Sequence, residues 1–490
     1  MDSSEYFSYC AAIGIVVLFI IYQLTYSKKK LKLPPGPFNL PIVGYLPFLG
    51  NKPNEKFEEL SKKYGNIYRL RLGMSWAVII TDFETLKETF SKSATLDKPS
   101  KLFDMMPDGL GLTSLNGKEW SEQRKITMKI MHELGLGKSK WQEGVQDEVD
   151  AFMRQLEKQR GEPYNVKPAL IASICNNVFS LIFGYNLTPD HPKMTIIRNL
   201  LISFPEVFRQ TGLLCLIPGI VGYFQKIGIS LEPHIKDTLI ANRLIREDVE
   251  NRKNDDVTDD ITYVRGYLNK MREEKLKGSS SYNDTNLIGN IQSLILGGID
   301  TTMTTLLWLF FAMASYPKIQ QKVFEEVDDV LGKSDKPQWA NRAQLPYTFA
   351  TIMECMRWRT IVPVNFQRKT TEDIKVRGYD IPKNTIIIAV LSAINNESKY
   401  WKTPEKFIPE RFLNEDGALV TKPEGWVPFS YGKRSCPGEV PAMIELLLYF
   451  TSIIQKFTIL PEAQQQPDLD GLPHFVVCPK IQKLRFIPRT

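Results

Sequence analysis

The pattern of apolar positions begins with an uncharged run from Tyr6 to Tyr26, long enough to cross a bilayer as a helix. A basic cluster follows this run: Lys28, Lys29, Lys30 and Lys32. A cleavable signal peptide would carry its positive charge before the apolar run. Because positive charge favours the cytosolic side of a membrane, we predict that residues 1–27 form a signal-anchor transmembrane helix with the following chain in the cytosol. The alternative is a buried core helix.

Prolines follow the lysines at Pro34, Pro35 and Pro37. Proline fixes φ and favours extended backbone, so residues 28–37 are predicted to form a basic and stiff hinge behind the anchor. A chain of 490 residues has room for about two to four domains. Residues 38–490, however, contain no linker-like stretch and no internal repeat. We therefore predict one large domain there.

The remaining pattern predicts a helical domain with small sheets. β-branched and aromatic residues concentrate in short runs that predict strands, at 67–72, 77–81, 373–388 and 475–487. Helical patterns dominate residues 116–359, with one long helix at about 285–316, and return at 439–454. The expected fold class is therefore mainly α with small β-sheets, an α+β arrangement.

Composition excludes several kinds of site. The six cysteines are widely spaced and none forms a C-x-x-C pair, which argues against a zinc ribbon and indicates reduced, cytosol-facing thiols. The net charge of +7 is modest, and no basic stripe interleaved with aromatic residues suggests nucleic-acid binding. No G-x-G-x-x-G follows a strand, so the electrons for any redox chemistry must come from another protein.

A short loop near the C-terminus carries the strongest chemical signal. Between Phe429 and Gly438, Cys436 follows Arg434 in a glycine-punctuated stretch. Glycine lets the backbone approach a large flat ligand, and the arginine supplies positive charge near an anionic group. This pattern suits a thiolate offered to a metal; the alternative is a core cysteine in an ordinary turn. The loop closely resembles the haem-ligand loop of the cytochromes P450, and the resemblance extends along nearly the whole chain.

The resemblance is to the animal microsomal, family 2-like cytochromes P450, and it implies the P450 fold with haem b (iron protoporphyrin IX) as the cofactor. Cys436 would be the axial ligand of the haem iron, and Phe429 and Arg434 would belong to the cofactor site. A thiolate ligand pushes electron density onto the iron and favours O–O cleavage, as is general for P450s.

The long predicted helix contains Gly297, Gly298, Asp300 and Thr301 near its middle. Two glycines inside a helix cost roughly 1 kcal/mol each against alanine. They indicate either a notch for helix packing or room for a flat macrocycle and dioxygen. The run resembles the oxygen-activation motif of P450s, in which Thr301 would hydrogen-bond a distal oxygen and Asp300 would connect it to solvent protons.

Glu354 and Arg357 form a Glu-x-x-Arg pattern that also occurs elsewhere in the chain, at Glu157/Arg160 and Glu206/Arg209. Such a pair is usually a solvated helix salt bridge. Position selects Glu354/Arg357, because a Pro-Glu-Arg-Phe segment containing Arg411 follows. The arrangement resembles the buried P450 network of these three residues, whose role is structural. Loss of one partner would strand a buried charge at a cost of roughly 3–5 kcal/mol.

Haem carries two propionates that require cations. Trp120 and Arg124 share one helix face by their i, i+4 spacing and resemble the P450 helix that holds a propionate. Arg368 and Arg434 are further candidates. Two positions depart from the common pattern: Gln367 stands where many relatives have histidine, and Lys98 where they usually have arginine. Lysine is a point charge rather than a planar fork, so its propionate contacts are expected to be weaker or differently placed.

Lysines gather around the Trp120 helix and the cysteine loop: Lys118, Lys125, Lys129, Lys138, Lys140 and Lys433, with Arg124 among them. They predict a basic docking face for an acidic redox partner, with a solvated helix surface as the alternative. By the resemblance, the partner would be NADPH–cytochrome P450 reductase, with cytochrome b5 as a second candidate, at the endoplasmic reticulum membrane. Residues 196–229 carry many apolar residues, of which a core face explains part; the excess resembles the P450 segment that dips into the bilayer surface and lets lipophilic substrates in.

The positions that match P450 substrate-contact segments are mostly apolar, which favours a lipophilic small molecule such as a steroid, fatty acid, terpenoid or xenobiotic. The expected activity is that of a monooxygenase using O2 and electrons from NADPH through a reductase. Two alternatives remain: a P450-type isomerase or dehydratase that needs no reductase, and a non-catalytic haem-binding protein. The Asp300–Thr301 pair argues against both.

Overall fold

The structure is a computed structural model. It describes residue 14 and residues 31–99, 111–134, 139–211, 232–254, 262–275, 281–463, 466–472 and 475–489. The predicted anchor at residues 1–27 lies outside these ranges apart from Gly14, as does most of the 196–229 segment. Among the described residues one helix, Asp284–Ser315, is long and apolar enough to cross a membrane. Its most apolar window is 72% buried inside the protein, as expected of a core helix.

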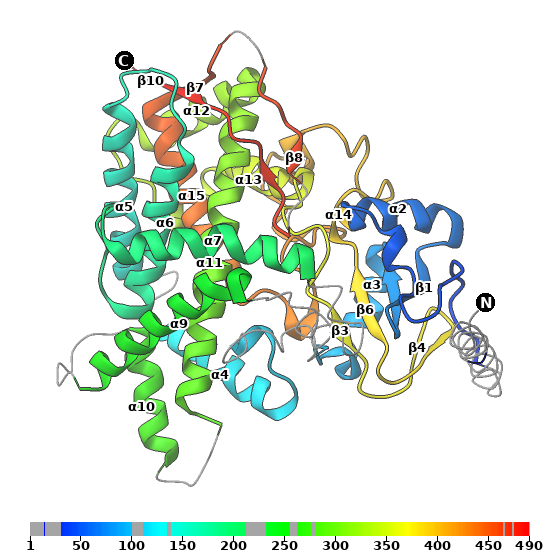
Figure 1. The fold of residues 1–490 in the computed structure, drawn as a ribbon. Helices are drawn as coiled ribbons and strands as arrows, with labels where there is room; N and C mark the ends of the chain where they lie inside the picture. Colours follow the sequence, from blue (N-terminus) through cyan, green and yellow to red (C-terminus); the bar gives the residue numbers. More distant parts are fainter. Residues whose placement is uncertain are drawn as a thin grey trace, which may run out of the picture.

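Helices form most of the molecule (Figure 1). The larger, helical part contains α4 (Gly117–Glu133), α5 (Ser139–Glu157), α6 (Lys167–Phe183), α7 (Pro192–Thr211), α9 (Glu232–Lys253), α10 (Tyr263–Lys275), α11 (Asp284–Ser315), α12 (Pro317–Leu331), α13 (Pro346–Trp358) and α15 (Glu439–Lys456). In the part of the chain that the structure describes, α2 (Pro53–Tyr64), α3 (Phe83–Phe90) and α14 (Leu391–Asn395) accompany the sheet. Short 3-10 turns include η4 (Gly111–Thr113), η7 (Pro409–Phe412) and η8 (Gly432–Arg434). The predicted fold class is confirmed.

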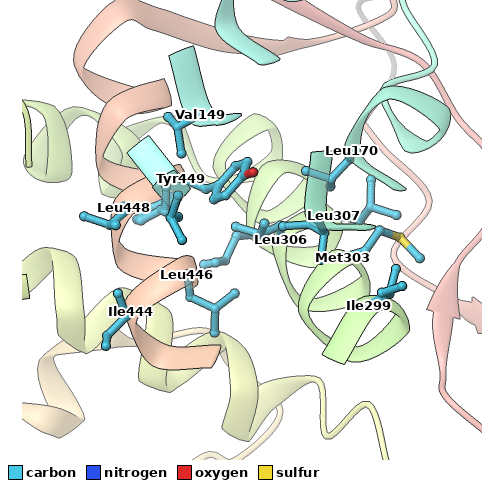
Figure 2. Close-up of a cluster of buried hydrophobic side chains, with 14 of the residues drawn as sticks. Val149, Leu170, Ile299, Met303, Leu306, Leu307, Ile444, Leu446, Leu448 and Tyr449 are labelled. Carbon is cyan, nitrogen blue, oxygen red and sulfur yellow. The ribbon is translucent and has the colours of Figure 1, made fainter. Parts of the chain in front are cut away.

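Helix α11 forms the centre of the core because it is apolar on all sides. It packs against α6, α13 and α15 and against strand β7. Figure 2 shows Leu446 and Tyr449 of α15 opposite Leu306 of α11, with Val149 of α5 and Leu170 of α6 around them. This packing places the start of α15, which follows the cysteine loop, beside the middle of α11.

The main sheet has the order β1-β2-β6-β3. Strands β1 (Ile67–Leu72) and β2 (Ser75–Ile80) are antiparallel, β6 (Ile386–Ala389) runs parallel to β2, and β3 (Arg368–Lys369) closes the edge. Within the described ranges, three two-stranded sheets pair β4 (Ile374–Val376) with β5 (Tyr379–Ile381), β7 (Phe457–Pro461) with β10 (Leu484–Pro488), and β8 (Gly471–Leu472) with β9 (Cys478–Pro479). The sequence pattern predicted the strand stretches except β3, β7 and β8; β7 continues the apolar run of α15 without a turn signal.

Candidate active site

The cysteine loop, α4 and α11 enclose a cavity of about 310 Å³, which we call the main cavity. A smaller space of about 100 Å³, the adjoining pocket, lies against the same stretch of α11. Gly297 and Thr301 line both spaces. Any ligand of the main cavity therefore lies between the cysteine loop and the middle of α11, with room for a second molecule next to it.

Cys436 opens onto the main cavity, so its side chain is accessible from that space although it lies deep in the protein. The loop needs glycine at Gly432, where φ is 77° and a Cβ would lie 2.3 Å from the Phe90 carbonyl oxygen. Burial raises the pKa of the Cys436 thiol, while the Gly438 N–H and the Arg124 charge oppose this rise. A bound metal ion would favour the thiolate.

Arg368 is 1% exposed and lines one end of the main cavity. Its Nη2 donates to the Tyr431 carbonyl at 2.7 Å, and its guanidinium lies 3.5 Å from the centroid of the Phe90 ring. Its Nη1 is buried without a hydrogen-bond partner. Burial lowers the pKa of Arg368 to about 9, and the nearby charge of Arg434 adds to the effect. An anion bound at this end of the cavity would therefore stabilise the buried cation.

Three further predicted cations line the same end: Lys98, Arg124 and Arg434. Burial lowers the pKa of each of them. Lys98 Nζ donates to the Phe366 carbonyl at 2.8 Å. Arg434 stacks 3.9 Å from the Trp120 ring centroid and donates to backbone carbonyls, so it fixes the loop as well as supplying charge. Among the described residues no carboxylate forms an ion pair with these cations or with Arg368.

The opposite end of the main cavity is largely apolar, with Met131, Leu181, Leu294 and Leu446 in its lining. Phe429 also lines the cavity and packs edge-on against Trp426. A flat ligand with acid groups on one edge and hydrocarbon on the other matches both ends. The donor set, with one thiol facing the cavity and buried cations lacking an anion, therefore fits haem.

The two glycines of α11, Gly297 and Gly298, have different roles: one serves helix packing and the other leaves space for a ligand. A Cβ at Gly298 would lie 3.0 Å from a Val178 methyl group on α6, so this glycine serves close helix packing. A Cβ at Gly297 would meet nothing within 4 Å, so this glycine leaves free space in the cavity. Thr301 Oγ1 donates to the Gly297 carbonyl at 2.5 Å, which leaves its lone pairs able to accept a hydrogen bond.

Asp300 is 8% exposed and lines the adjoining pocket beside Thr301. Burial raises the pKa of its carboxyl group to about 6, against the effect of the Lys167 charge at the start of α6. Asp300 can therefore change its protonation state within the physiological range, as a proton donor or acceptor must.

Glu354, Arg357 and Arg411 come together away from both cavities. Arg357 Nε and Nη2 donate to the two Glu354 oxygens at 2.6 and 2.9 Å, and both side chains are fully buried. Arg411 Nε lies 3.4 Å from Glu354 Oε1, and the Ile408 N–H donates to the same oxygen at 2.8 Å. This arrangement joins α13 to η7, in keeping with a structural role.

Glu445 is a residue that the sequence reasoning missed. It is 4% exposed, lines the main cavity and hydrogen-bonds with Asn177 and Thr302. Burial raises the pKa of its carboxyl group to about 8. An acid inside the apolar run of α15 was the available signal, since such residues are rarely buried without a partner.

Comparisons with known proteins agree with this geometry. A model of the cytochrome P450 family matches residues 34–486. The chain is 32% identical to cytochrome P450 2D9 of Mus musculus over 498 residues, which cover 98% of this chain and 97% of the relative. It is 30% identical to cytochrome P450 18a1 of Drosophila melanogaster, with 94% and 88% covered, and 30% identical to cytochrome P450 2J2 of Homo sapiens, with 98% and 96% covered.

Proposed function

Because this chain belongs to the cytochrome P450 family of haem-thiolate monooxygenases, we propose that it binds haem b through Cys436 and hydroxylates or epoxidises a lipophilic small molecule. The observation that carries this proposal is one cavity with the Cys436 sulfur on one wall, unmatched cations at one end and the Gly297–Thr301 stretch on the other wall. The bound haem would supply oxygen activation with electrons delivered from NADPH.

The protein residues would hold the cofactor and manage protons. Arg368, Arg124 and Lys98 supply the positive charge that the propionates need, and Arg434 holds the loop next to them. Asp300 takes up protons on the α6 side of α11, where Lys167 lies near. The Thr301 hydroxyl donates to the Gly297 carbonyl, so its lone pairs would accept a hydrogen bond from a group bound in the cavity and orient that group toward the reacting centre.

The adjoining pocket supports a lipophilic substrate. Apolar side chains dominate its lining: Leu201, Leu296, Val362, Phe366, Phe475 and Val476. The Asn365 side chain offers no polar anchor to a substrate, because its amide nitrogen donates to the Phe366 carbonyl and its oxygen accepts from the Ala389 N–H. Steroids, fatty acids, terpenoids and lipophilic xenobiotics remain the proposed substrate classes. By resemblance to P450 substrate-contact segments, Phe204 and Phe208 are further proposed substrate contacts; their side chains lie outside the described part of the chain.

NADPH–cytochrome P450 reductase is the proposed electron donor, with cytochrome b5 as a second partner. Lys125 on α4 and Lys433 in the cysteine loop are exposed, while Lys118 and Lys129 form exposed i, i+4 pairs on α4. The side chains of Lys138 and Lys140, which belong to the same predicted face, lie outside the described part of the chain. We expect the double substitution Lys125→Glu and Lys129→Glu to raise the apparent KM for reductase. The matched control is Lys375→Glu on β4, which is 81% exposed. Equal KM values for all three proteins would contradict a docking face on α4.

We also propose a single-pass anchor in the endoplasmic reticulum membrane, with residues 38–490 as the cytosolic haem domain. Large apolar side chains are exposed just after the hinge, including Phe38 at 80% and Ile42 at 50%. Such residues favour contact with membrane lipid. Deletion of residues 1–27 should move the protein from the alkali-resistant membrane fraction toward the soluble fraction, and an unchanged distribution would count against the anchor.

The first test is the carbon-monoxide difference spectrum of the reduced protein. The wild type should give the thiolate-type band, and Cys436→Ser should lose it; a serine variant with the normal spectrum would refute the assignment. Formation of product that requires NADPH and reductase, with label from oxygen gas, then tests monooxygenation. A binding-spectrum screen of steroids, fatty acids and terpenoids would narrow the substrate class.

A further inference from the structure

Asn290 is a fully buried amide on α11 that lines neither cavity. Its Nδ2 donates to Gln123 Oε1 at 2.9 Å, and its Oδ1 accepts from the Leu112 N–H at 3.0 Å. It also hydrogen-bonds the Tyr263 hydroxyl. The amide is therefore engaged on both its oxygen and its nitrogen, and its partners come from α4, η4 and α10.

Leu112 connects Asn290 to the cysteine loop. Its N–H is bonded to Asn290, while its carbonyl accepts from Arg434 Nη1 at 3.2 Å. Arg434 also donates to the carbonyls of Leu96 and Leu115. A shift of the Leu112 backbone would therefore move the guanidinium of Arg434, the residue two positions before Cys436.

Gln123 connects Asn290 to the helix that carries Arg124. Its Oε1 accepts from the Tyr267 hydroxyl at 2.8 Å as well as from Asn290, and its Nε2 donates to the Ser281 carbonyl at 2.7 Å. Gln123 is fully buried. These bonds fix the rotation of α4 about its axis and its position along α11. They therefore also fix Arg124, which directly follows Gln123 on α4.

The contacts close into a ring, because Arg434 stacks 3.9 Å from the Trp120 ring on α4. We define the contact ring by its members: Asn290, Leu112, Arg434, Trp120 and Gln123. Gly111 supports it independently. Its φ is 41°, and a Cβ there would lie 2.3 Å from the Asn290 backbone nitrogen, so only glycine lets η4 approach α11 this closely.

We propose that Asn290 is a positioning residue for the acid groups of the cofactor: through Leu112 and Gln123 it fixes Arg434 and Arg124 at the cationic end of the main cavity. This inference rests on the proposed haem site. Buried amides require partners in fixed geometry, whereas an apolar side chain of similar size would pack in several ways. A ring of such bonds therefore holds two guanidiniums that repel each other; the Asp97 charge lies near Arg434, but no carboxylate among the described residues forms an ion pair with either guanidinium.

The experiment compares Asn290→Leu with Gln320→Leu in the haem-loaded full chain. Gln320 is a matched control: it is 3% exposed and its amide bonds the Met313 carbonyl and both backbone groups of Ile459, away from both cavities. Transfer of haem to apomyoglobin should be about tenfold faster in Asn290→Leu, the effect of weakening one charge-assisted hydrogen bond, and within about twofold of wild type in Gln320→Leu. The reduction potential should become more negative only in Asn290→Leu, because less positive charge faces the propionates.

Gln123→Leu keeps the Leu112 bond and serves as a second variant if Asn290→Leu does not fold. Gln123→Leu should transfer haem at a rate between those of wild type and Asn290→Leu. The double variant with both substitutions should transfer haem no faster than Asn290→Leu alone. Equal haem transfer and equal potentials in the Asn290, Gln123 and Gln320 variants, at similar melting temperatures, would overturn the inference alone. A wild type without a thiolate-type haem spectrum would instead overturn the proposed function, and the inference with it.

Discussion

Two fully buried arginines, Arg357 and Arg368, lie eleven positions apart and have opposite surroundings. Arg357 is saturated by protein groups: both Glu354 oxygens and further acceptors at Asn395, Asn396, Pro404 and Lys406. Arg368 has one carbonyl, one aromatic face and a buried N–H without a partner. Both cations lose their hydration, but only one is compensated within the chain.

The difference separates structure from binding. A buried ion pair complete with hydrogen bonds holds α13 to η7 whether or not a ligand is present. A buried cation that faces a cavity without a carboxylate costs stability until an anion arrives. Asp300 resembles Arg368 with the opposite charge: it is a buried acid that lines a pocket and has no ion pair within the described residues. Four substitutions test this contrast.

The largest effect is expected from Glu354→Leu, which leaves Arg357 buried without its carboxylate. We expect a loss of about 3–5 kcal/mol in the free energy of unfolding, measured by urea denaturation. The control is Glu55→Leu, because Glu55 forms an i, i+3 pair with Lys52 that is more than half exposed. That variant should lose less than about 1 kcal/mol. Similar losses would show that burial does not distinguish the two pairs.

Asp300→Asn should lower kcat by about 10²-fold or more, because the asparagine cannot carry a proton. In the wild type kcat should fall as the pH drops through about 6, where the carboxylate becomes protonated, and this limb should vanish in the variant. The folded-state pKa lies above the unfolded value, so the stability that protonation contributes is complete below the unfolded pKa and is lost as the pH rises through about 6. The variant should therefore melt higher than wild type at pH 7. A pH profile of kcat that keeps its acid limb would remove Asp300 from proton delivery.

Arg368→Leu should have little effect on the folding of the haem-free chain, because it removes an uncompensated cation, yet it should weaken haem retention. Transfer of haem to apomyoglobin should be about tenfold faster, as expected for one lost charge-assisted hydrogen bond. Arg368→Lys keeps the charge but not the planar fork and should give a smaller effect. Unchanged transfer in the leucine variant would mean that Arg368 does not serve an acid group of the cofactor.

The smallest effect is expected from Arg411→Ala. Arg411 contacts Glu354 at 3.4 Å, but Arg357 still satisfies both carboxylate oxygens in the variant. Arg411 also donates to the Lys402 and Thr403 carbonyls, but these bonds are exposed to solvent and contribute little. Thermal denaturation should therefore show a loss of about 1 kcal/mol. A loss as large as that of Glu354→Leu would show that the two arginines share the buried carboxylate equally.

Local sequence signals predicted the loop of Cys436, the long helix α11 and strands β1 and β6, because periodicity and glycine positions are written in neighbouring residues. They also singled out Glu354/Arg357 from two other copies of the same pattern. They did not distinguish the roles of Gly297 and Gly298, because both lie in one helix and only the approach of Val178 on α6 separates them.

By itself the sequence determined the family, and it predicted the residue that would bind the metal and the cations that would lie near the cofactor. Only the tertiary structure decided which of those cations lack a partner, that Arg434 is bound to backbone carbonyls, and that Asn290 and Gln123 hold the helices around them. The physical reason is that motifs record chemistry between near neighbours along the chain. Burial and hydrogen-bond completeness depend on residues more than a hundred positions apart, which meet only when the core has packed.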